Sequence, residues 1–303
     1  MTEQESFAAS AAATSQTTAP ILASTPVTVR SLIEVGAHFG HQTERWNPKM
    51  TKFIFGERNG VHIINLDKTV EAWGRASKYI YDTIARGGSI LFVGTKVQAR
   101  DIVKEEAARC GGHYVTSRWL GGTLTNFQTI RNSLSRMAKL EELLASAENP
   151  NSDVKLNKKE KLTISRQLEK LEANLGGIRS MKSAPDVIFL VDLNKEDIAI
   201  REAERLGIPV VALTDTNVDP GTVAYPIPAN DDSARTLRLF LSAVADIVIE
   251  ARKSFQSRTG RSEEGGRGRS ARTAAAAPVE QAQASSVAPV AETPVAEAPA
   301  AEA

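Results

Sequence analysis

The sequence predicts an α/β fold, a three-layer α/β/α domain that occupies residues 27–255. Short apolar runs alternate there with amphipathic stretches of helical length, which is typical of βαβ units and a parallel sheet. The composition also changes on both sides of this region, from Ser, Thr and Ala before it to Ala, Pro and Glu after it. A chain of 303 residues with 42% apolar and 24% charged residues is ordinary for one or two globular domains.

The predicted strands are the short apolar runs. They occupy residues 61–64, 89–93, 187–191 and 210–213, and a weaker run occupies residues 113–115. Runs of this length rich in Val, Ile and Phe are typical of buried strands.

The predicted helices between the strands carry start and stop signals. Asp67 is placed to cap a helix that ends near Gly87. Gly111 and Gly207 stand where a helix C-terminus requires a left-handed residue. The last helix is predicted from residue 233 to residue 253.

Residues 123–177 break this alternation. Apolar residues recur there at spacings of three and four in two stretches, 124–144 and 164–175, which flank a polar loop. Two antiparallel helices packed along one seam require such narrow apolar stripes. We therefore predict an inserted helical hairpin, a short coiled coil that protrudes from the α/β domain. Two further helices lying on the sheet are the alternative.

Two terminal segments are predicted to be disordered tails. Residues 1–26 contain no Lys or Arg and no sustained apolar block, so they resemble neither a signal peptide nor a membrane helix. Residues 256–303 are mostly Ala, Pro, Glu, Ser and Gly, which cannot bury enough apolar surface to offset the entropy of ordering. The single cysteine, Cys110, excludes an internal disulfide and fits a reducing cytoplasm.

Motifs for nucleotide binding and catalysis are incomplete. The turn after residues 89–93 has one glycine, Gly94, whereas a dinucleotide fingerprint requires three and a P-loop requires a second glycine before its lysine. Asp215 and Asp219 are spaced like the start of a calcium loop, but Pro226 stands where that loop requires glutamate. The sequence has no Gly-x-Ser-x-Gly elbow. We therefore expect that the protein has no enzymatic activity, no cofactor and no small-molecule substrate. The alternative is an enzyme of the nucleotide-binding α/β class.

Three residues are weak candidates for a zinc site. His38 and His41 lie three residues apart, and Cys110 would complete a His/Cys set if the fold brought the three together. Spacing of this kind specifies little, so structural histidines are the alternative interpretation.

Positive charge is concentrated in two segments. The whole chain has a formal charge of +1, but residues 27–255 carry 32 basic and 28 acidic residues, a charge of +4. The loop at 41–58 is basic, and residues 118–182 contain twelve basic and seven acidic residues. Cations on loops and on an extended hairpin suit contacts with RNA phosphates, and two tryptophans are available for stacking on bases. A solvated charged helix face is the alternative.

The candidate rRNA-binding residues are the cations and tryptophans of these two segments. They are Arg45, Trp46, Lys49, Lys52, Arg58, Arg118, Trp119, Arg131, Arg136, Lys139, Lys155, Lys158 and Lys159.

Two long segments resemble the signatures of one family. Residues 32–41 read Leu-Ile-Glu-Val-Gly-Ala-His-Phe-Gly-His and continue through Arg-Trp-Asn-Pro-Lys-Met at 45–50. This segment closely resembles the N-terminal signature of the bacterial family of small-subunit ribosomal protein S-two. Residues 185–192, continuing through Glu202 to residues 207–209, resemble the second signature of that family.

The resemblance covers residues 27–255, because residues 117–126 and 215–217 are also similar to family sequence. It implies a flavodoxin-like parallel sheet, a protruding helical hairpin and a structural, non-enzymatic role on the cytoplasmic ribosome. Family members bind small-subunit rRNA and help to hold ribosomal protein S-one, which recruits mRNA. We therefore expect rRNA and other small-subunit proteins, including ribosomal protein S-one, as partners, and no membrane. Some members have been linked to zinc, for which His38, His41 and Cys110 are the candidates here.

Overall fold

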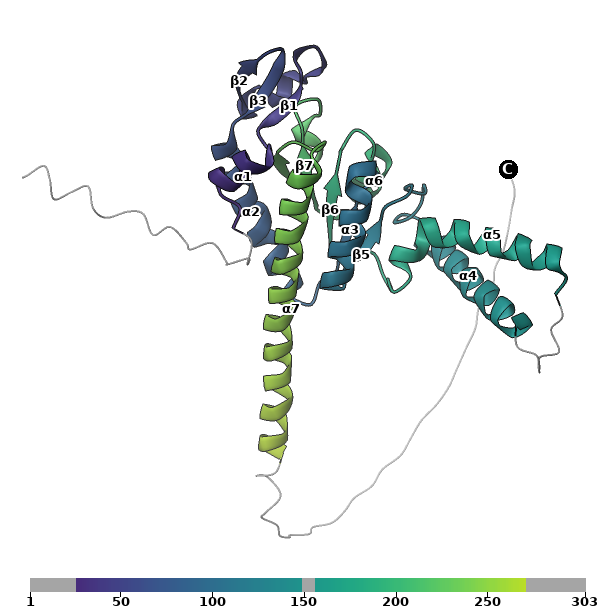
Figure 1. The fold of residues 1–303 in the computed structure, drawn as a ribbon. Coiled ribbons are helices and arrows are strands. Elements are labelled where there is room, and N and C mark those ends of the chain that lie inside the picture. The colour runs from purple at the N-terminus through teal and green to yellow at the C-terminus, as the bar shows by residue number, and fades with distance from the viewer. Residues whose placement is uncertain (1–25, 149–155, 271–303) are drawn as a thin grey trace, which may run out of the picture. The chain divides into compact units, whose positions relative to one another are not determined.

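The computed structural model describes residues 26–148 and 156–270, and the side chains of these residues except 148 and 260–270. The chain divides into two units, Met1–Thr259 and Gly260–Ala303. Both sheets and the described side chains belong to the first unit, whose elements are shown in Figure 1.

Five parallel strands form the central sheet. In chain order they are β4 (Ile90–Val93), β5 (His113–Val115), β6 (Val187–Val191), β7 (Val210–Thr214) and β8 (Tyr225–Pro228). They lie side by side in the order β5-β4-β6-β7-β8, the order of flavodoxin-like doubly wound sheets. The predicted parallel sheet is confirmed, including the weaker strand at 113–115, and β8 is an additional strand that the apolar runs did not reveal.

A small antiparallel sheet contains the remaining three strands. These are β1 (Phe39–Gln42), β2 (Ile54–Arg58) and β3 (Val61–Ile64), in the order β1-β3-β2. Residues 61–64 form a strand as predicted, but in this sheet and not in the parallel one. The cause is the turn at Asn59 and Gly60, whose φ angles of 53° and 73° are both positive, as in the tight turn that favours an antiparallel hairpin.

Alternate side chains of the sheet enter two cores. Ile90, Phe92 and Phe189 pack with helices α2 (Leu66–Ile84), α3 (Val97–Cys110) and α7 (Ala234–Ser270). Leu91, Val93 and Ile188 pack on the opposite face with α6 (Asp197–Leu206) and with residues between 115 and 181. Helical residues therefore cover both faces of the sheet, in agreement with a three-layer α/β/α fold.

The helix ends follow local chemistry. Helix α1 (Val29–Val35) and helix α6 end at left-handed glycines, as does α3 at Gly111, whose φ is 68°. Helix α2 is capped by Asn65, whose Oδ1 accepts from the backbone N of Asp67 at 3.0 Å. The prediction of Asp67 as the cap was therefore wrong by two positions, because the preceding asparagine reaches the free amides first.

Helices α4 (Phe127–Glu148) and α5 (Lys158–Leu175) coincide with the two stretches of three-and-four spacing and lie side by side (Figure 1). Ile130 and Leu175 belong to the second core, and Met137 of α4 is fully buried. Nζ of Lys161 donates to the carbonyl O of Ala147 at 3.0 Å. Residues 149–155, which join the helices, lie outside the described residues.

Helix α7 extends beyond the predicted boundary at residue 255 and ends at Ser270. The side chain of Arg258 donates to the carbonyl O of Ala85, and the ring of Phe255 lies against Gly87, so these two residues contact the chain just after α2. Continuing a packed helix avoids the cost of nucleating a new one, so the helix that was predicted to end at residue 253 extends further. The predicted disorder of residues 1–25 and 271–303 lies outside the described residues.

No helix in the part of the chain that the structure describes is both long and apolar enough to cross a membrane.

Candidate functional site

A cluster of mostly buried charged residues lies at the carboxyl end of the parallel sheet. We call it the Lys96 cluster; its members are Lys96, Asp192, Asp215, Asp231, Asp232 and His41. Lys96 follows β4, Asp192 follows β6, Asp215 follows β7, and the last two aspartates follow β8. Parallel strands end at one edge of a sheet, so residues far apart in the sequence meet there.

Lys96 is the central cation of the cluster. Its Nζ lies 2.7 Å from Asp231 Oδ1, 2.6 Å from Asp232 Oδ1 and 3.8 Å from Asp192 Oδ2. Burial alone would lower the pKa of Lys96, but its contacts with these aspartates raise that pKa above its ordinary value. The ammonium is therefore charged at neutral pH and neutralises part of the acidic charge.

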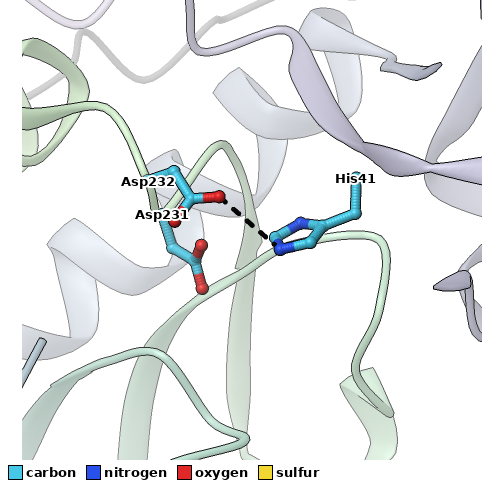
Figure 2. A group of neighbouring side chains, drawn as sticks. All are labelled: His41, Asp231 and Asp232. Carbon is cyan, nitrogen blue, oxygen red and sulfur yellow. Dashed lines mark ion pairs between the residues drawn. The ribbon is translucent and has the colours of Figure 1, made fainter.

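His41 connects the small antiparallel sheet to the same cluster. Its Nδ1 lies 3.1 Å from Asp215 Oδ2. Its Nε2 lies 3.5 Å from Asp232 Oδ2, and Figure 2 shows this second pair. The pairing with Asp215 raises the pKa of His41 against the opposing effect of burial. Burial and the nearby Asp215 raise the pKa of Asp231 to about 6, despite its contact with Lys96. His41 and Asp231 therefore bind their protons more tightly in the folded protein than these groups ordinarily do.

The cluster occupies the edge at which doubly wound proteins bind ligands. The switch point of this sheet lies between β4 and β6, where Lys96 and Asp192 are 3.8 Å apart. The side chain of Thr95 donates to Glu196, so a second pair of polar groups near this edge is also satisfied. A Cβ at Gly94 would lie 3.0 Å from Cγ2 of Val103, which shows that this glycine serves helix packing. The arrangement favours a structural joint over a phosphate cradle.

The three predicted zinc candidates do not form one site. Among the described residues, the group that resembles a metal site is His41, Asp231 and Asp232, whose ligand atoms lie within 4.8 Å of one another. It includes neither His38, which lies against Phe39, nor Cys110, which is buried at the end of α3. Burial lowers the pKa of His38 and raises the pKa of the Cys110 thiol.

This group also does not fit zinc well. Lys96 already contacts both aspartates, and a cation beside the carboxylates opposes a second cation. The His38, His41 and Cys110 set is therefore corrected to one histidine within an ion-pair cluster.

The basic segment at 41–58, predicted as a loop, includes the end of β1 and all of β2, and it exposes most of its predicted RNA-binding side chains. We keep the name loop at 41–58 for it. Arg45, Lys52 and Arg58 are exposed, and Trp46 is 38% exposed with its ring 5.2 Å from that of His62. Lys49 is exposed but pairs with Asp219. Four cations and one tryptophan of this segment are thus exposed, and one of the cations is paired with Asp219.

The predicted cations around α4 and α5 are also exposed. They are Arg118, Arg131, Arg136, Lys139, Lys158 and Lys159. Lys155 lies outside the described residues. Among the side chains that the structure describes, no carboxylate forms an ion pair with Arg118, Arg131 or Lys139.

Trp119 corrects the prediction of a second stacking residue. It is only 5% exposed and belongs to the core, and its Nε1 donates to Oε1 of Glu202 at 3.0 Å. Because both the ring and the N–H are used within the protein, Trp119 offers no face to a base.

Two features went unnoticed in the sequence. The first is the Lys96 cluster, for which the signal was present, since each predicted parallel strand is followed by a charged residue. The second is the stretch 107–140, which contains no Asp or Glu but five basic residues. Averaging charge over residues 118–182 concealed it.

Comparison with known proteins identifies the family. The model of the family described as ribosomal protein S2 matches residues 32–251. The small ribosomal subunit protein uS2 of Chelativorans sp. (strain BNC1) is 53% identical over 232 residues, which are 77% of this chain and 85% of that protein. The uS2 of Agrobacterium fabrum is 52% identical over 77% of this chain and 89% of its own length. The uS2 of Azorhizobium caulinodans is 54% identical over 73% of this chain and 66% of its own length.

Proposed function

Because the chain belongs to the ribosomal protein S2 family, whose members are structural and non-enzymatic proteins of the small ribosomal subunit, we propose that it binds small-subunit rRNA through localised basic surfaces. These surfaces are the loop at 41–58 and the exposed sides of α4 and α5. Residues 27–255 form the ribosomal domain in this proposal, and the ribosome in the cytoplasm is its location.

The observation that carries the proposal is the acid-free stretch of residues 107–140. Arg131, Ser135 and Lys139 follow one another at four-residue spacing on the exposed side of α4, opposite its apolar stripe. Many other cations of the chain are neutralised, for example Arg75 by Glu71 and Arg201 by Asp197. Unpaired cations are suited to phosphates, because their charge is not already compensated.

The proposal includes a hairpin made of α4 and α5. Their mutual packing and the bond from Lys161 to Ala147 support an antiparallel, coiled-coil-like pair. A rigid pair of helices would fix the direction of its exposed cations, which positions a protein on RNA without reading its sequence.

Protein partners complete the proposal. Membership of the family supports contacts with other small-subunit proteins and with ribosomal protein S-one. The modest charge of +4 over residues 27–255 leaves large parts of the surface suited to protein neighbours.

The proposal is tested by measuring the affinity for purified small-subunit rRNA as salt is raised. The combined variant Arg118→Ala, Arg131→Ala and Lys139→Ala removes three unpaired cations. The slope of log K against log salt should fall by roughly 0.7 to 0.9 for each phosphate that the variant no longer neutralises. The matched control replaces Lys78, Lys104 and Arg205, three exposed cations of α2, α3 and α6, with alanine. An unchanged slope in the first variant, or an equal fall in both, would contradict the proposal.

A further inference from the structure

A buried carboxylate organises the loop that precedes α4. Glu202 of α6 is 7% exposed, and no cation of the described residues forms an ion pair with it. Its Oε1 accepts from Trp119 Nε1 at 3.0 Å and from the backbone N of Gly122 at 2.8 Å. Its Oε2 accepts from the backbone N of Leu124 at 2.9 Å and from the backbone N and the hydroxyl of Thr125 at 3.1 and 3.2 Å.

The donors of these five hydrogen bonds all belong to residues 119–125. The buried carboxylate of Glu202 therefore fixes the conformation of this loop. A buried carboxylate is normally compensated by a cation, and here the dipoles of a single loop replace it. Burial alone would raise the pKa of Glu202, but the hydrogen bonds from Trp119, Leu124, Thr125 and Gly122 lower it below its ordinary value. Glu202 is therefore ionised at neutral pH and accepts all five bonds.

The outer side of this loop has the chemistry of an RNA-contacting surface. Arg118, Gly121, Thr125 and Asn126 are exposed, and none of them is acidic. No atom lies within 4 Å of the position of a Cβ on Gly121, so its backbone is open to close approach. Asn126 Oδ1 accepts from the hydroxyl of Thr129 at 2.9 Å, which leaves its amide group to donate outward.

We propose that residues 117–126 contact the rRNA backbone and that Glu202 is the residue that positions them. This inference rests on the proposed rRNA binding and assigns it a specific surface. Arg118 supplies charge, while the Asn126 amide and the Gly121 backbone suit phosphate oxygens and ribose hydroxyls. An acidic peptide fits this surface less well than RNA does. The surface has one arginine surrounded by neutral hydrogen-bonding groups, which suit the closely spaced phosphates and ribose hydroxyls of an RNA backbone.

The loop also continues directly into the exposed cations of α4. Because Glu202 holds the loop, Arg118 keeps a constant position relative to Arg131. Both cations can then bind one RNA, and the entropic cost of ordering the loop does not weaken the binding. The bonds at Gly122 and Leu124 are the rigid part of this arrangement, since they involve the backbone.

The test compares Glu202→Gln with Arg118→Ala and with the double variant, using purified small-subunit rRNA over a range of salt. The amide of Gln has nearly the same size but cannot accept all five bonds, because its NH₂ group meets N–H donors. Glu202→Gln should lower the salt slope by about the same amount as Arg118→Ala, roughly 0.7 to 0.9. The double variant should show no further fall. Hydrogen exchange at residues 119–125 should increase in Glu202→Gln and in the double variant, but not in Arg118→Ala.

Glu204→Gln is the matched control, since Glu204 is an exposed carboxylate of the same helix. It should change neither the slope nor the exchange. If Glu202→Gln does not fold, Trp119→Phe removes a single donor and keeps an aromatic ring in the core, and it should give a partial fall in slope.

A purely structural role for Glu202 predicts a different result. The melting temperature would fall and exchange would rise, but the salt slope of the folded variant would equal that of the wild type, which would overturn the inference. An unchanged slope in Arg118→Ala would overturn it as well. If a variant with only Arg131→Ala and Lys139→Ala still lowered the slope, rRNA binding would stand without this loop, whereas a wild-type protein that does not bind rRNA would contradict both proposals.

Discussion

Replacing Lys96 with methionine should destabilise the protein more than any exposed lysine substitution. Methionine keeps most of the side-chain stem but removes the ammonium, which lies 2.7 Å from Asp231 and 3.8 Å from Asp192. Both aspartates are buried, so their charges would remain in the protein without a partner. Removing one member of a buried ion pair costs about 3–5 kcal/mol for this reason.

The burial of each partner sets the expected magnitude. The side chain of Asp232 is 55% exposed, so water replaces most of its interaction with Lys96. The cost therefore comes from Asp231 and Asp192, and we expect the free energy of unfolding to fall by about 3 kcal/mol at pH 8. The loss should be smaller at pH 5, because Asp231, with a pKa of about 6 even beside Lys96, takes up a proton there.

The assay is urea-induced unfolding at pH 5 and pH 8, followed by the fluorescence of the buried Trp73 and Trp119. Lys104→Met is the matched control, because Lys104 is an exposed residue of α3. It should change the free energy of unfolding by no more than about 0.5 kcal/mol. If Lys96→Met lost no more stability than this control, or lost the same amount at both pH values, the ion pairs of the Lys96 cluster would not stabilise the fold.

Three further substitutions test other parts of the structure. The raised pKa of Asp231 means that the folded state binds its proton more tightly than the unfolded state does. This group therefore lowers the free energy of unfolding as the pH rises from about 4 to about 6. In Asp231→Asn, urea titrations across that pH range should no longer show this contribution. Gly74→Ala should raise the free energy of unfolding by about 0.5–1 kcal/mol in the same assay, because Gly74 lies inside α2 with no atom within 4 Å of a new Cβ. Gly177→Ala should instead lower the free energy of unfolding by about 1–3 kcal/mol, because the new Cβ would overlap the backbone O of Tyr114. If the two alanine substitutions changed the melting temperature equally, this interpretation of the two glycines would be refuted.

The elements that the sequence predicts are those defined by local patterns. The runs at 187–191 and 210–213 are strands because their uninterrupted apolar character requires burial on both faces of a sheet. Gly111 and Gly207 end helices because a left-handed residue is needed there. The turn at Asn59 and Gly60 is also a local pattern. Interpreted as a hairpin turn, it would have predicted that β3 belongs to an antiparallel sheet.

The residues of the Lys96 cluster and of the Glu202 loop were harder to predict because their contacts are remote in sequence. Lys96 meets Asp231 across 135 positions, and Trp119 meets Glu202 across 83 positions. Such pairs follow from the strand order, which local periodicity does not determine. The burial of Trp119 has the same origin, since an aromatic residue in a polar loop is equally compatible with stacking on RNA and with a bond to a buried carboxylate.

The Lys96 cluster explains how a fold that commonly holds ligands can serve as a rigid support. Besides the ion pairs of His41, the backbone N of Asn47 donates to Thr216 O at 2.8 Å, and the backbone N of His41 donates to Thr216 Oγ1 at 2.9 Å. A Cβ at Gly40 would lie 2.6 Å from the Thr216 side chain, so the two segments approach each other closely. The ligand-binding edge of the sheet is thereby used to fix the loop at 41–58.

This use of charge also changes the meaning of the modest net charge. Carboxylates point inward to Lys96 and His41, or pair with cations such as Arg109, and these groups cancel in any total. Among the described cations that form no ion pair, several lie in the acid-free stretch 107–140 and in the loop at 41–58. An RNA phosphate responds to the charge within about a Debye length, roughly 8–10 Å at physiological salt, and not to the total over the chain. A protein with a charge of +4 over residues 27–255 can therefore present strongly basic surfaces to RNA while the rest of its surface remains suited to protein neighbours.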